Sequence, residues 1–369
     1  MWLYYSLIIF IVLIGILFEK LGRNIYLYIV FGVFLVIAGF RADIIGNDTR
    51  VYTNLFKSIA FSDDLSIFSP RFELGYVYFN KLLTFFSTNP QIILFSSSLI
   101  ILFGFMKFIQ SYSKIPWLSV YLFFTLGYFG MTMNTIRLNM ALVIILYSYN
   151  LLRKNQVIRF VVVVLLASLF HRTAIIFLIA WPIKNIRISK KNIIGIVLMS
   201  AIIYSFFPVF INILFRIFPT YQYYLGSEYL NGEIRLASVM NMLVGVSIIT
   251  FGLITRKYTS SIETSDFVYV KTKQNLNVND KKLMLLLLIL SVPITFLSFR
   301  FNLLDRVSDY FLVFAIVYLP NAIKDIRDKK LLLIILVMVI FLFFLYSTFI
   351  QILRPDWNRI YPYYFFKNI

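Results

Sequence analysis

Three charged side chains lie inside apolar segments of this sequence, where a plain membrane anchor would carry none. Arg137 stands near the start of one apolar run, and His171 and Arg172 stand in the middle of the next. An arginine at the centre of a membrane span costs roughly 2.5–3.5 kcal/mol, so a charge inside a span marks a functional site by default. We therefore take the stretch 134–174, which contains both runs, as the predicted site.

The chemistry of soluble enzymes has no signature in this chain. It contains no Walker loop, no GxGxxG motif and no HExxH motif, and it has a single histidine and no cysteine. Asp63 and Asp64 form the one acidic pair in the predicted outer loops, and solvated loop residues explain such a pair more often than a cation site does. The sequence therefore indicates neither a catalytic triad nor a metal centre.

Composition sets the fold class. Hydrophobic residues make up 60% of the 369 residues and charged residues 14%, in many separate apolar runs of about 16–20 residues. We predict an all-α polytopic integral membrane protein, with one membrane domain over 1–369 and a first run that is kept as a span rather than cleaved as a signal peptide. The predicted spans lie near 2–18, 25–40, 91–110, 116–133, 135–152, 236–255, 283–299, 307–323 and 331–349, with two irregular regions at 158–184 and 192–218.

Lysine and arginine in the short loops set the orientation. Loops that hold 21 of the 35 basic residues are assigned to the cytoplasm, and two of them flank 158–184. We therefore predict that 158–184 is a re-entrant-like hairpin with His171 and Arg172 at its tip. The alternative is one long tilted helix, which would invert every basic loop downstream. With the hairpin counted as two passes, the chain makes about 12 passes and both termini lie outside.

The basic residues on the predicted outer side differ in type from those inside. Eleven of these 14 residues are arginines, against six of the 21 cytoplasmic ones. Orientation needs only charge, whereas arginine presents a planar fork that grips phosphate through two hydrogen bonds. We predict a phosphorylated anionic ligand at the outer face, although about half of these arginines are expected to snorkel or to pair with acids. The division of the +19 charge between two membrane sides argues against nucleic acid as a partner.

Three long loops are predicted, at 41–90 and 208–235 outside and at 256–282 in the cytoplasm. In the first, Gly46-Asn47-Asp48 signals a turn, and Asp48 is explained equally well as the cap of a helix that begins at Thr49. The apolar spacing of 73–86 predicts a helix that lies in the membrane interface. The aromatic residues of the second loop either stack on sugar rings or form an interfacial belt, which is the commoner role.

Five short motifs follow one another along most of the chain. They are Arg41 with Gly46-Asn47-Asp48 and Tyr52, Glu73 with Gly75-Tyr76, Asn134 with Arg137, Ala167 with Phe170-His171-Arg172-Thr173-Ala174, and the ending Tyr361-Pro362-Tyr363. Together they resemble the EpsG group of Wzy-type bacterial polysaccharide polymerases, and the histidine step within a hydrophobic hairpin is the most specific of them. The resemblance implies a fold related to the C-type membrane glycosyltransferases and the O-antigen ligases.

The resemblance also implies an activity and its location. Such an enzyme makes O-antigen, capsule or exopolysaccharide by transferring a growing glycan from undecaprenyl diphosphate to the non-reducing end of another lipid-linked repeat unit. The reaction takes place at the outer face of the bacterial cytoplasmic membrane. The implied partners are undecaprenyl-diphosphate-linked oligosaccharides and membrane lipids, with a chain-length regulator and a flippase as further candidates.

This chemistry suggests roles for the singled-out residues. A diphosphate leaves readily, so the enzyme needs no acid partner and only one base for the acceptor hydroxyl, and several arginines can replace the charge of a metal. We predict no metal and no cofactor. The predicted bases are His171 first and Asp48 second, the predicted diphosphate ligands are Arg137, Arg172, Arg300, Arg306 and Arg41, and the predicted glycan-binding residues are Glu73, Tyr76, Asn134 and Tyr52.

Two questions stay open at this point. Arg137 and His171 are expected to serve one cavity because sequential helices are usually neighbours, but His171 would also suit a purely structural hydrogen bond that holds the hairpin closed. An O-antigen ligase or another lipid-linked glycosyltransferase would share the chemistry. A lipid-linked oligosaccharide flippase or another transporter would also carry charge within spans, although internal repeats, usual in transporters, are not visible here.

Overall fold

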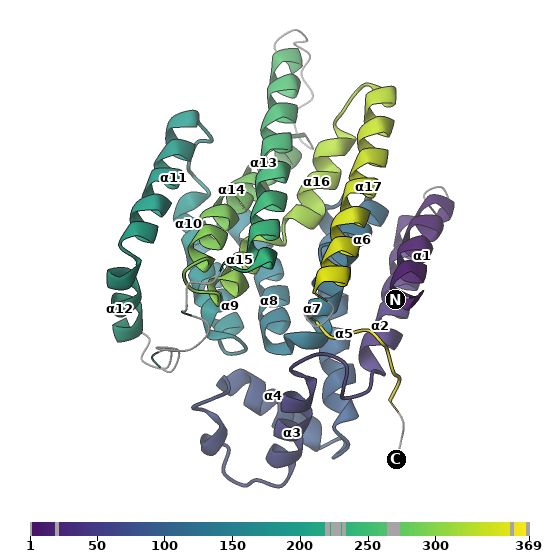
Figure 1. The fold of residues 1–369 in the computed structure, drawn as a ribbon, viewed down its shortest axis with the longest axis vertical. Helices are drawn as coiled ribbons and strands as arrows, with labels where there is room; N and C mark the ends of the chain where they lie inside the picture. Colours follow the sequence, from purple (N-terminus) through teal and green to yellow (C-terminus); the bar gives the residue numbers. More distant parts are fainter. Residues whose placement is uncertain are drawn as a thin grey trace. The chain divides into compact units, whose positions relative to one another are not determined.

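The computed structural model describes residues 2–18, 22–217, 222, 230, 234–263, 274–354 and 358–366, and the regular elements in these ranges are helices (Figure 1). The predicted all-α class is confirmed. The chain forms two compact units. The first consists of Met1–Leu151, Ile158–Ile175 and Ile326–Ile369, and the second of Leu152–Val157 and Ile176–Asp325. The single membrane domain over 1–369 stays a prediction.

Within the described ranges, five helices are long and apolar enough to cross a membrane. They are α5 (Gln91–Tyr112), Leu236–Thr255, Asp280–Ser298, Leu304–Lys324 and α17 (Lys329–Leu353). Helices α11 (Lys190–Ser205) and α12 (Phe207–Ile217) would form a sixth span, but they are bent by 83°. Pro208 accounts for this break in the predicted region 192–218, because proline is tolerated in a first helical turn and not in a helix interior. The count of about 12 passes stays a prediction.

The first unit holds the N-terminal helices and α17. Its other helices are α1 (Trp2–Phe18), α2 (Arg23–Gly39), α3 (Thr49–Ala60), the 3-10 helix η1 (Ser66–Phe68), α4 (Leu74–Thr84), α6 (Pro116–Thr125), α7 (Tyr128–Asn134), α8 (Ile136–Arg153) and α9 (Val157–Ser168). Helix α2 packs along α5, and α1 packs against α6. Phe34 stacks on Phe129 with ring centroids 4.4 Å apart. The predicted span 116–133 is broken at Gly127, whose φ of 86° is a conformation that glycine adopts without strain.

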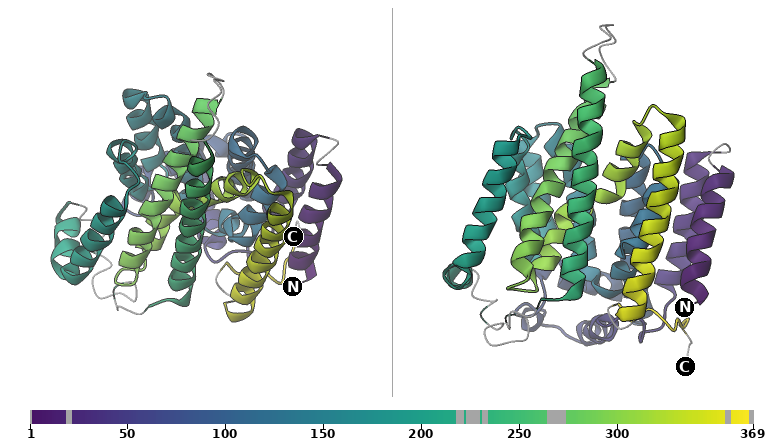
Figure 2. Two further views of the ribbon diagram at one scale, coloured as in Figure 1. Left: turned by 90° about the horizontal axis from the view of Figure 1, so that it is seen from above. Right: turned by 45° about the horizontal axis from the view of Figure 1, so that its top comes forward.

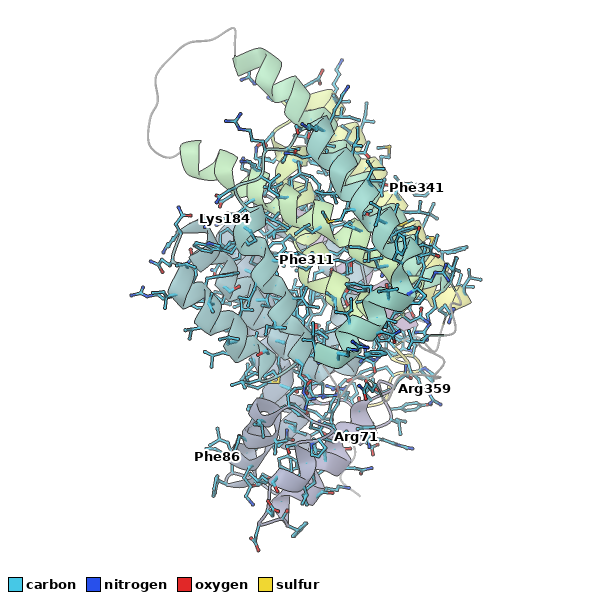
Figure 3. The ribbon with its side chains drawn as sticks, turned by 90° about the vertical axis from the view of Figure 1, so that its left-hand side faces the viewer. Arg71, Phe86, Lys184, Phe311, Phe341 and Arg359 are labelled. Atoms are coloured by element: carbon cyan, nitrogen blue, oxygen red, sulfur yellow. The ribbon has the colours of Figure 1, made fainter. Side chains whose placement is uncertain are left out.

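Helices α3 and α4 lie across one end of the long helices of this unit (Figures 1 and 2). Helix α4 buries Tyr76, Val77 and Leu83 on one side. The aromatic residues at its far end are exposed, and Phe86 points away from the helices (Figure 3). The helix predicted over 73–86 is confirmed, and its position in the membrane interface stays a prediction.

Both described ends of the chain lie at the α3–α4 end of the first unit. The ring centroids of Tyr4 and Tyr361 are 5.6 Å apart. The backbone N–H of Ala42 donates to the Tyr364 carbonyl at 3.0 Å, and the N–H of Phe366 donates to the Phe40 carbonyl at 2.8 Å. Both ends therefore share a side with the loop 41–90, as the predicted topology requires. That this side faces outward stays a prediction.

The second unit is built around α14. Its elements include η2 (Arg172–Ile179), which begins in the first unit, and α10 (Ala180–Ile183), α13 (Leu236–Glu263), α14 (Gln274–Ser298), α15 (Leu304–Leu312) and α16 (Ala315–Lys324). Helix α14 packs against α13 and α15, and Arg153 pairs with Asp280 at 2.7 Å. Helices α13 and α14 extend into the predicted loop 256–282, of which 264–273 lies outside the described residues. Helix α12 extends into the predicted loop 208–235, most of whose aromatic residues also lie outside them.

The segment 158–184 turns back on itself, as predicted. Helix α9 ends at Ser168, and after a short break the chain returns through η2 and α10. Lys184 Nζ donates to Asn155 Oδ1 at 2.7 Å, which brings the two ends of the segment together. The alternative of one long helix is therefore wrong. The cytoplasmic position of these two ends stays a prediction.

Candidate active site

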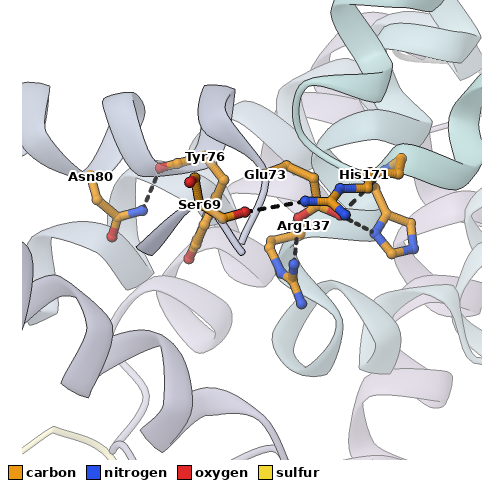
Figure 4. A network of polar contacts seen from close by, with 7 residues as sticks. Ser69, Glu73, Tyr76, Asn80, Arg137 and His171 are labelled. Atoms are coloured by element: carbon orange, nitrogen blue, oxygen red, sulfur yellow. Dashed lines mark hydrogen bonds and ion pairs between the residues drawn. The ribbon is translucent and has the colours of Figure 1, made fainter. Parts of the chain in front are cut away.

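The central residue of the site is Glu73, which stands directly before the first residue of α4. Its side chain is 8% exposed. One carboxylate oxygen, Oε2, accepts a hydrogen bond from Arg137 Nη1 (Figure 4). The other oxygen, Oε1, lies 3.3 Å from His171 Nδ1 and accepts from the Arg172 backbone N–H at 3.3 Å. The two residues that the sequence placed in one cavity therefore contact opposite oxygens of one carboxylate.

Two breaks between helices make this convergence possible. Arg137 is the second residue of α8, and α8 begins directly after the non-helical Thr135 that ends α7. His171 lies in the break between α9 and η2, where its backbone N–H donates to the Ala167 carbonyl at 3.1 Å. Each side chain thus comes from a helix end, where the backbone can turn it toward α4.

Helix α4 docks closely onto the tip of the hairpin. A Cβ atom on Gly75 would lie 2.7 Å from the Leu169 carbonyl oxygen, a distance that real Cβ atoms do not reach. One turn further along α4, Phe79 contacts Phe170, with ring centroids 6.4 Å apart. Arg172 Nη2 also donates to the Ser69 carbonyl at 3.2 Å. The glycine of the Glu73-x-Gly75 motif therefore lets the hairpin approach the carboxylate.

The carboxyl of Glu73 stays ionised. Burial raises its pKa, but the hydrogen bond with His171 and the charge of Arg137 outweigh that effect and lower the pKa to about 2. An acid with this pKa cannot donate a proton near neutral pH. Glu73 is therefore a fixed negative charge in contact with Arg137 and His171, an arrangement in which a carboxylate can orient a histidine.

Aromatic rings and a further arginine surround this carboxylate. The Arg137 guanidinium carbon lies 5.0 Å from the centre of the Phe72 ring and 5.9 Å from that of Tyr52. The exposed Arg71 lies over the same Phe72 ring at 5.5 Å. Three arginines, counting Arg172, thus stand close to one carboxylate, so the site carries net positive charge. This arrangement suits an anionic ligand.

Asp48 lies beside this group, one helical turn from Tyr52 on α3. It stands directly before α3, but its side chain makes no capping hydrogen bond. Its backbone N–H donates to Asn134 Oδ1 at 3.1 Å, and Asn134 precedes Arg137 by three residues. The helix begins at Thr49 with Asp48 as its N-cap residue, as predicted, but the Asp48 side chain does not bond the helix N-terminus. The two base candidates, His171 and Asp48, both belong to the first unit, and Asp48 is tied to the start of the Arg137 segment through its backbone bond to Asn134.

Tyr76 and Arg41 are fully buried. Burial raises the pKa of the Tyr76 hydroxyl well above its usual value, so this group stays protonated. Arg41 donates to the Met133 carbonyl at 3.0 Å, to Ser98 Oγ at 3.3 Å and to the Ala38 carbonyl. Burial lowers its pKa to about 10, which still leaves it charged at neutral pH. These contacts favour a structural role for Arg41, and its binding of diphosphate stays a prediction.

Arg300 and Arg306, the other two predicted diphosphate ligands, belong to the second unit. The Arg300 guanidinium lies 4.7 Å from the centre of the Tyr204 ring. Arg306 lies in the first turn of α15, next to Asp305, which accepts a hydrogen bond from Ser238 Oγ at 2.5 Å. Their participation in the site of the first unit stays a prediction. In the part of the chain that the structure describes, no three acidic or histidine side chains cluster in a way that would hold a metal.

The residue types do not show that Glu73 is the centre of the site. Its carboxylate contacts Arg137, His171 and the Arg172 backbone, and its binding of glycan stays a prediction. One signal was present, because Glu73 is the only glutamate between residues 41 and 90 and directly precedes an apolar helix. Ser69 and Phe72, which contact the arginines, carried no signal of their own.

Comparison with known proteins gives a match to a family model. Neither a curated protein nor a solved structure matches the chain significantly. The EpsG family model matches residues 24–365, a range that includes Glu73, Arg137, His171 and the C-terminal motif. The chain therefore belongs to the EpsG family, whose members are membrane proteins of the polysaccharide-polymerase type.

Proposed function

We propose that this protein polymerises polysaccharide from repeat units carried on undecaprenyl diphosphate, at the outer face of the bacterial cytoplasmic membrane. The observation that carries the proposal is the convergence of Arg137 and His171 on opposite oxygens of Glu73. A base and an anion-binding group held by one carboxylate are the two elements that transfer from a lipid diphosphate requires. The family relationship supports the same reaction class.

In the proposed reaction, the bond between the anomeric carbon of the donor glycan and the phosphate oxygen breaks. A new bond forms between that carbon and a hydroxyl oxygen at the non-reducing end of the acceptor. The acceptor hydroxyl gives its proton to His171, and the electron pair of the broken bond leaves with undecaprenyl diphosphate. No acid is needed on the leaving group, because a diphosphate already carries the developing charge.

Glu73 is a positioning residue in this proposal. A neutral imidazole that donates from Nδ1 to a carboxylate carries its lone pair on Nε2, which is then the atom that accepts the proton. The same carboxylate fixes the guanidinium plane of Arg137, which binds the diphosphate as negative charge grows on it. Arg172 and Arg71 add positive charge nearby. The net positive charge therefore favours the leaving group over the bound donor.

The proposed partners follow from the substrate. Both donor and acceptor are undecaprenyl-diphosphate-linked oligosaccharides, which reach the site from the surrounding lipid. A flippase must deliver these units to the outer leaflet, and a chain-length regulator is a further proposed partner. An O-antigen ligase or another lipid-linked glycosyltransferase would use the same donor with a different acceptor, so the acceptor separates these reactions.

The test is the lipid-linked glycan that accumulates when the gene is deleted. Single repeat units on the lipid in the outer leaflet are the expected result, with polymer restored by the wild-type gene and by the control variant Asp43→Asn. Asp43 is a suitable control because it is an exposed acid of the same loop, with 57% of its side chain accessible. Full-length polymer on the lipid would instead indicate a ligase. Units trapped in the cytoplasmic leaflet would indicate a flippase.

A further inference from the structure

The C-terminal motif Tyr361-Pro362-Tyr363 has no role in the proposed reaction, yet it belongs to a segment that lies against the site. We call residues 358–366 the C-terminal strap. The strap pairs with the chain around Arg41 through an isolated antiparallel bridge between Arg41 and Phe365. Tyr363 Oη donates to the Ile37 carbonyl at 2.5 Å. The strap is thus attached at several points to the end of α2.

The first residues of the strap reach the Asp48 side of the site. Asn134 Nδ2 donates to Asn358 Oδ1 at 3.3 Å, and the Oδ1 atom of the same Asn134 accepts from the Asp48 backbone N–H. The Gly46 backbone N–H donates to the Arg359 carbonyl at 3.1 Å. The strap therefore holds both ends of the Gly46–Asp48 turn. Arg359 bonds Gly46 directly, and Asn358 reaches Asp48 through Asn134.

Both backbones at this junction are unusual. Gly46 has a φ of 90°, and Arg359 has a φ of 48°. The left-handed conformation is unfavourable for a residue with a side chain, so it persists only where the surroundings enforce it. A Cβ atom on Gly46 would also lie 2.9 Å from the Met133 carbonyl oxygen. The turn is therefore packed tightly against Met133 and bonded to the strap at Arg359, next to a carboxylate that makes no capping bond.

We propose that the C-terminal strap positions Asp48 to bind the acceptor glycan, through Asn358 and the backbone carbonyl of Arg359. An ionised carboxylate accepts hydrogen bonds from sugar hydroxyls, so Asp48 contacts the acceptor while His171 removes its proton. This inference rests on the proposed polymerase function. It adds an acceptor subsite to the proposed active site. Two segments form this subsite, and their residues Asp48 and Asn358 are 310 positions apart in the sequence.

The first experiment is a double-mutant cycle on the purified full chain. Elongation of lipid-diphosphate-linked repeat units is measured for Asn358→Ala, Asp48→Ala and the double variant, with Asn89→Ala as the control. Asn89 is an exposed asparagine of the same predicted outer loop whose side chain accepts from the nearby Gln91 backbone N–H. We expect at least a tenfold loss for each single variant, a raised KM for the acceptor, and a double variant no slower than Asp48→Ala. Losses that multiply would overturn the proposal.

A second measurement does not depend on activity. The chain has no cysteine, so Asp48→Cys gives a single thiol whose labelling rate with a membrane-impermeant maleimide reports the position of residue 48. Adding Asn358→Ala should change this rate severalfold, and adding Asn89→Ala should not. An unchanged rate would overturn the strap as a positioning element, whatever the chain catalyses. Failure of the wild-type protein to elongate any lipid-linked unit would refute the proposed function alone.

Discussion

Arg41 and Glu73 are both buried charges in the first unit, but the protein neutralises them in different ways. Arg41 is fully buried and is bound by backbone carbonyls and one serine, groups that cannot change their charge. Glu73 is bound by Arg137 and His171, whose side chains are 20% and 11% exposed. A charge held by fixed dipoles stabilises a fold, whereas a charge held by ionisable, partly accessible groups can take part in a reaction. The comparison therefore separates a buried charge with a structural role from a buried charge at the candidate site.

The largest effect on activity is expected at His171, the partner of Glu73. His171→Ala should lower elongation by about 10²–10⁴-fold, the usual contribution of a general base. The thermal unfolding midpoint should stay close to the wild-type value, because His171 lies at the edge of the buried core. Donor binding should also persist, and Arg137→Ala should weaken it. A stable His171→Ala protein with near wild-type activity would move the base assignment to Asp48.

Substitution of Arg41 should instead lower the stability of the fold. Arg41→Met removes a donor from three buried oxygens, of which the Met133 carbonyl keeps the Thr49 hydroxyl. Each buried acceptor left without a partner costs about 1–3 kcal/mol. We expect a loss of roughly 3 kcal/mol in unfolding free energy and a poor yield of folded protein. Detergent-solubilised thermal unfolding measures the change, with Arg50→Met as the exposed control, since 66% of the Arg50 side chain is accessible. A normally stable Arg41→Met protein would show that its buried contacts are dispensable.

Acid sensitivity should also differ between the two charges. The pKa of Glu73 is lowered to about 2 in the folded protein, from an ordinary value of 4.5. Its stabilising contribution is therefore complete above pH 4.5 and is lost as the pH falls from 4.5 through 2. We expect Glu73→Gln to remove about 2 kcal/mol of this acid-dependent stability. Unfolding midpoints measured in steps from pH 7 to pH 3 test this, and identical slopes in wild type and Glu73→Gln would contradict it.

A smaller effect should reveal whether geometry or charge matters at the anion-binding arginines. Arg137→Lys keeps the charge and loses the planar fork, so elongation should fall nearly as far as in Arg137→Ala, by about tenfold or more. The same substitution at Arg300 and Arg306 tests whether the second unit takes part. Steady-state kinetics with varied donor measure the effect. Full activity in all three lysine variants would show that charge alone suffices.

Local patterns predicted much of the fold. The apolar runs predicted the helices. The basic residues on both sides of 158–184 predicted the hairpin, whose ends are joined by the hydrogen bond between Lys184 and Asn155. Helix breaks were harder, because the break at Gly127 follows from a single backbone conformation within an apolar run. The boundaries around α12, α13 and α14 also shifted, since polar residues can extend an apolar helix beyond its span.

Individual residues of the site were predictable, and their partners were not. A charged residue in an apolar run is conspicuous in the sequence, and this makes Arg137 and His171 predictable. Glu73 lies 64 positions from Arg137 and 98 from His171, so only the folded chain brings the three together. The burial of Arg41 was equally invisible, because its carbonyl partners belong to the backbone and leave no trace in the residue types.

The central claim is that Glu73 acts on the transfer reaction through His171. Its most direct test compares turnover at saturating donor for wild type, Glu73→Gln, His171→Ala and the double variant, so that any change in donor binding through Arg137 is removed. We predict that Glu73→Gln lowers turnover at least tenfold in the wild-type background and by a much smaller factor in the His171→Ala background, where only its effect through Arg137 remains. A further tenfold loss in the double variant would contradict it.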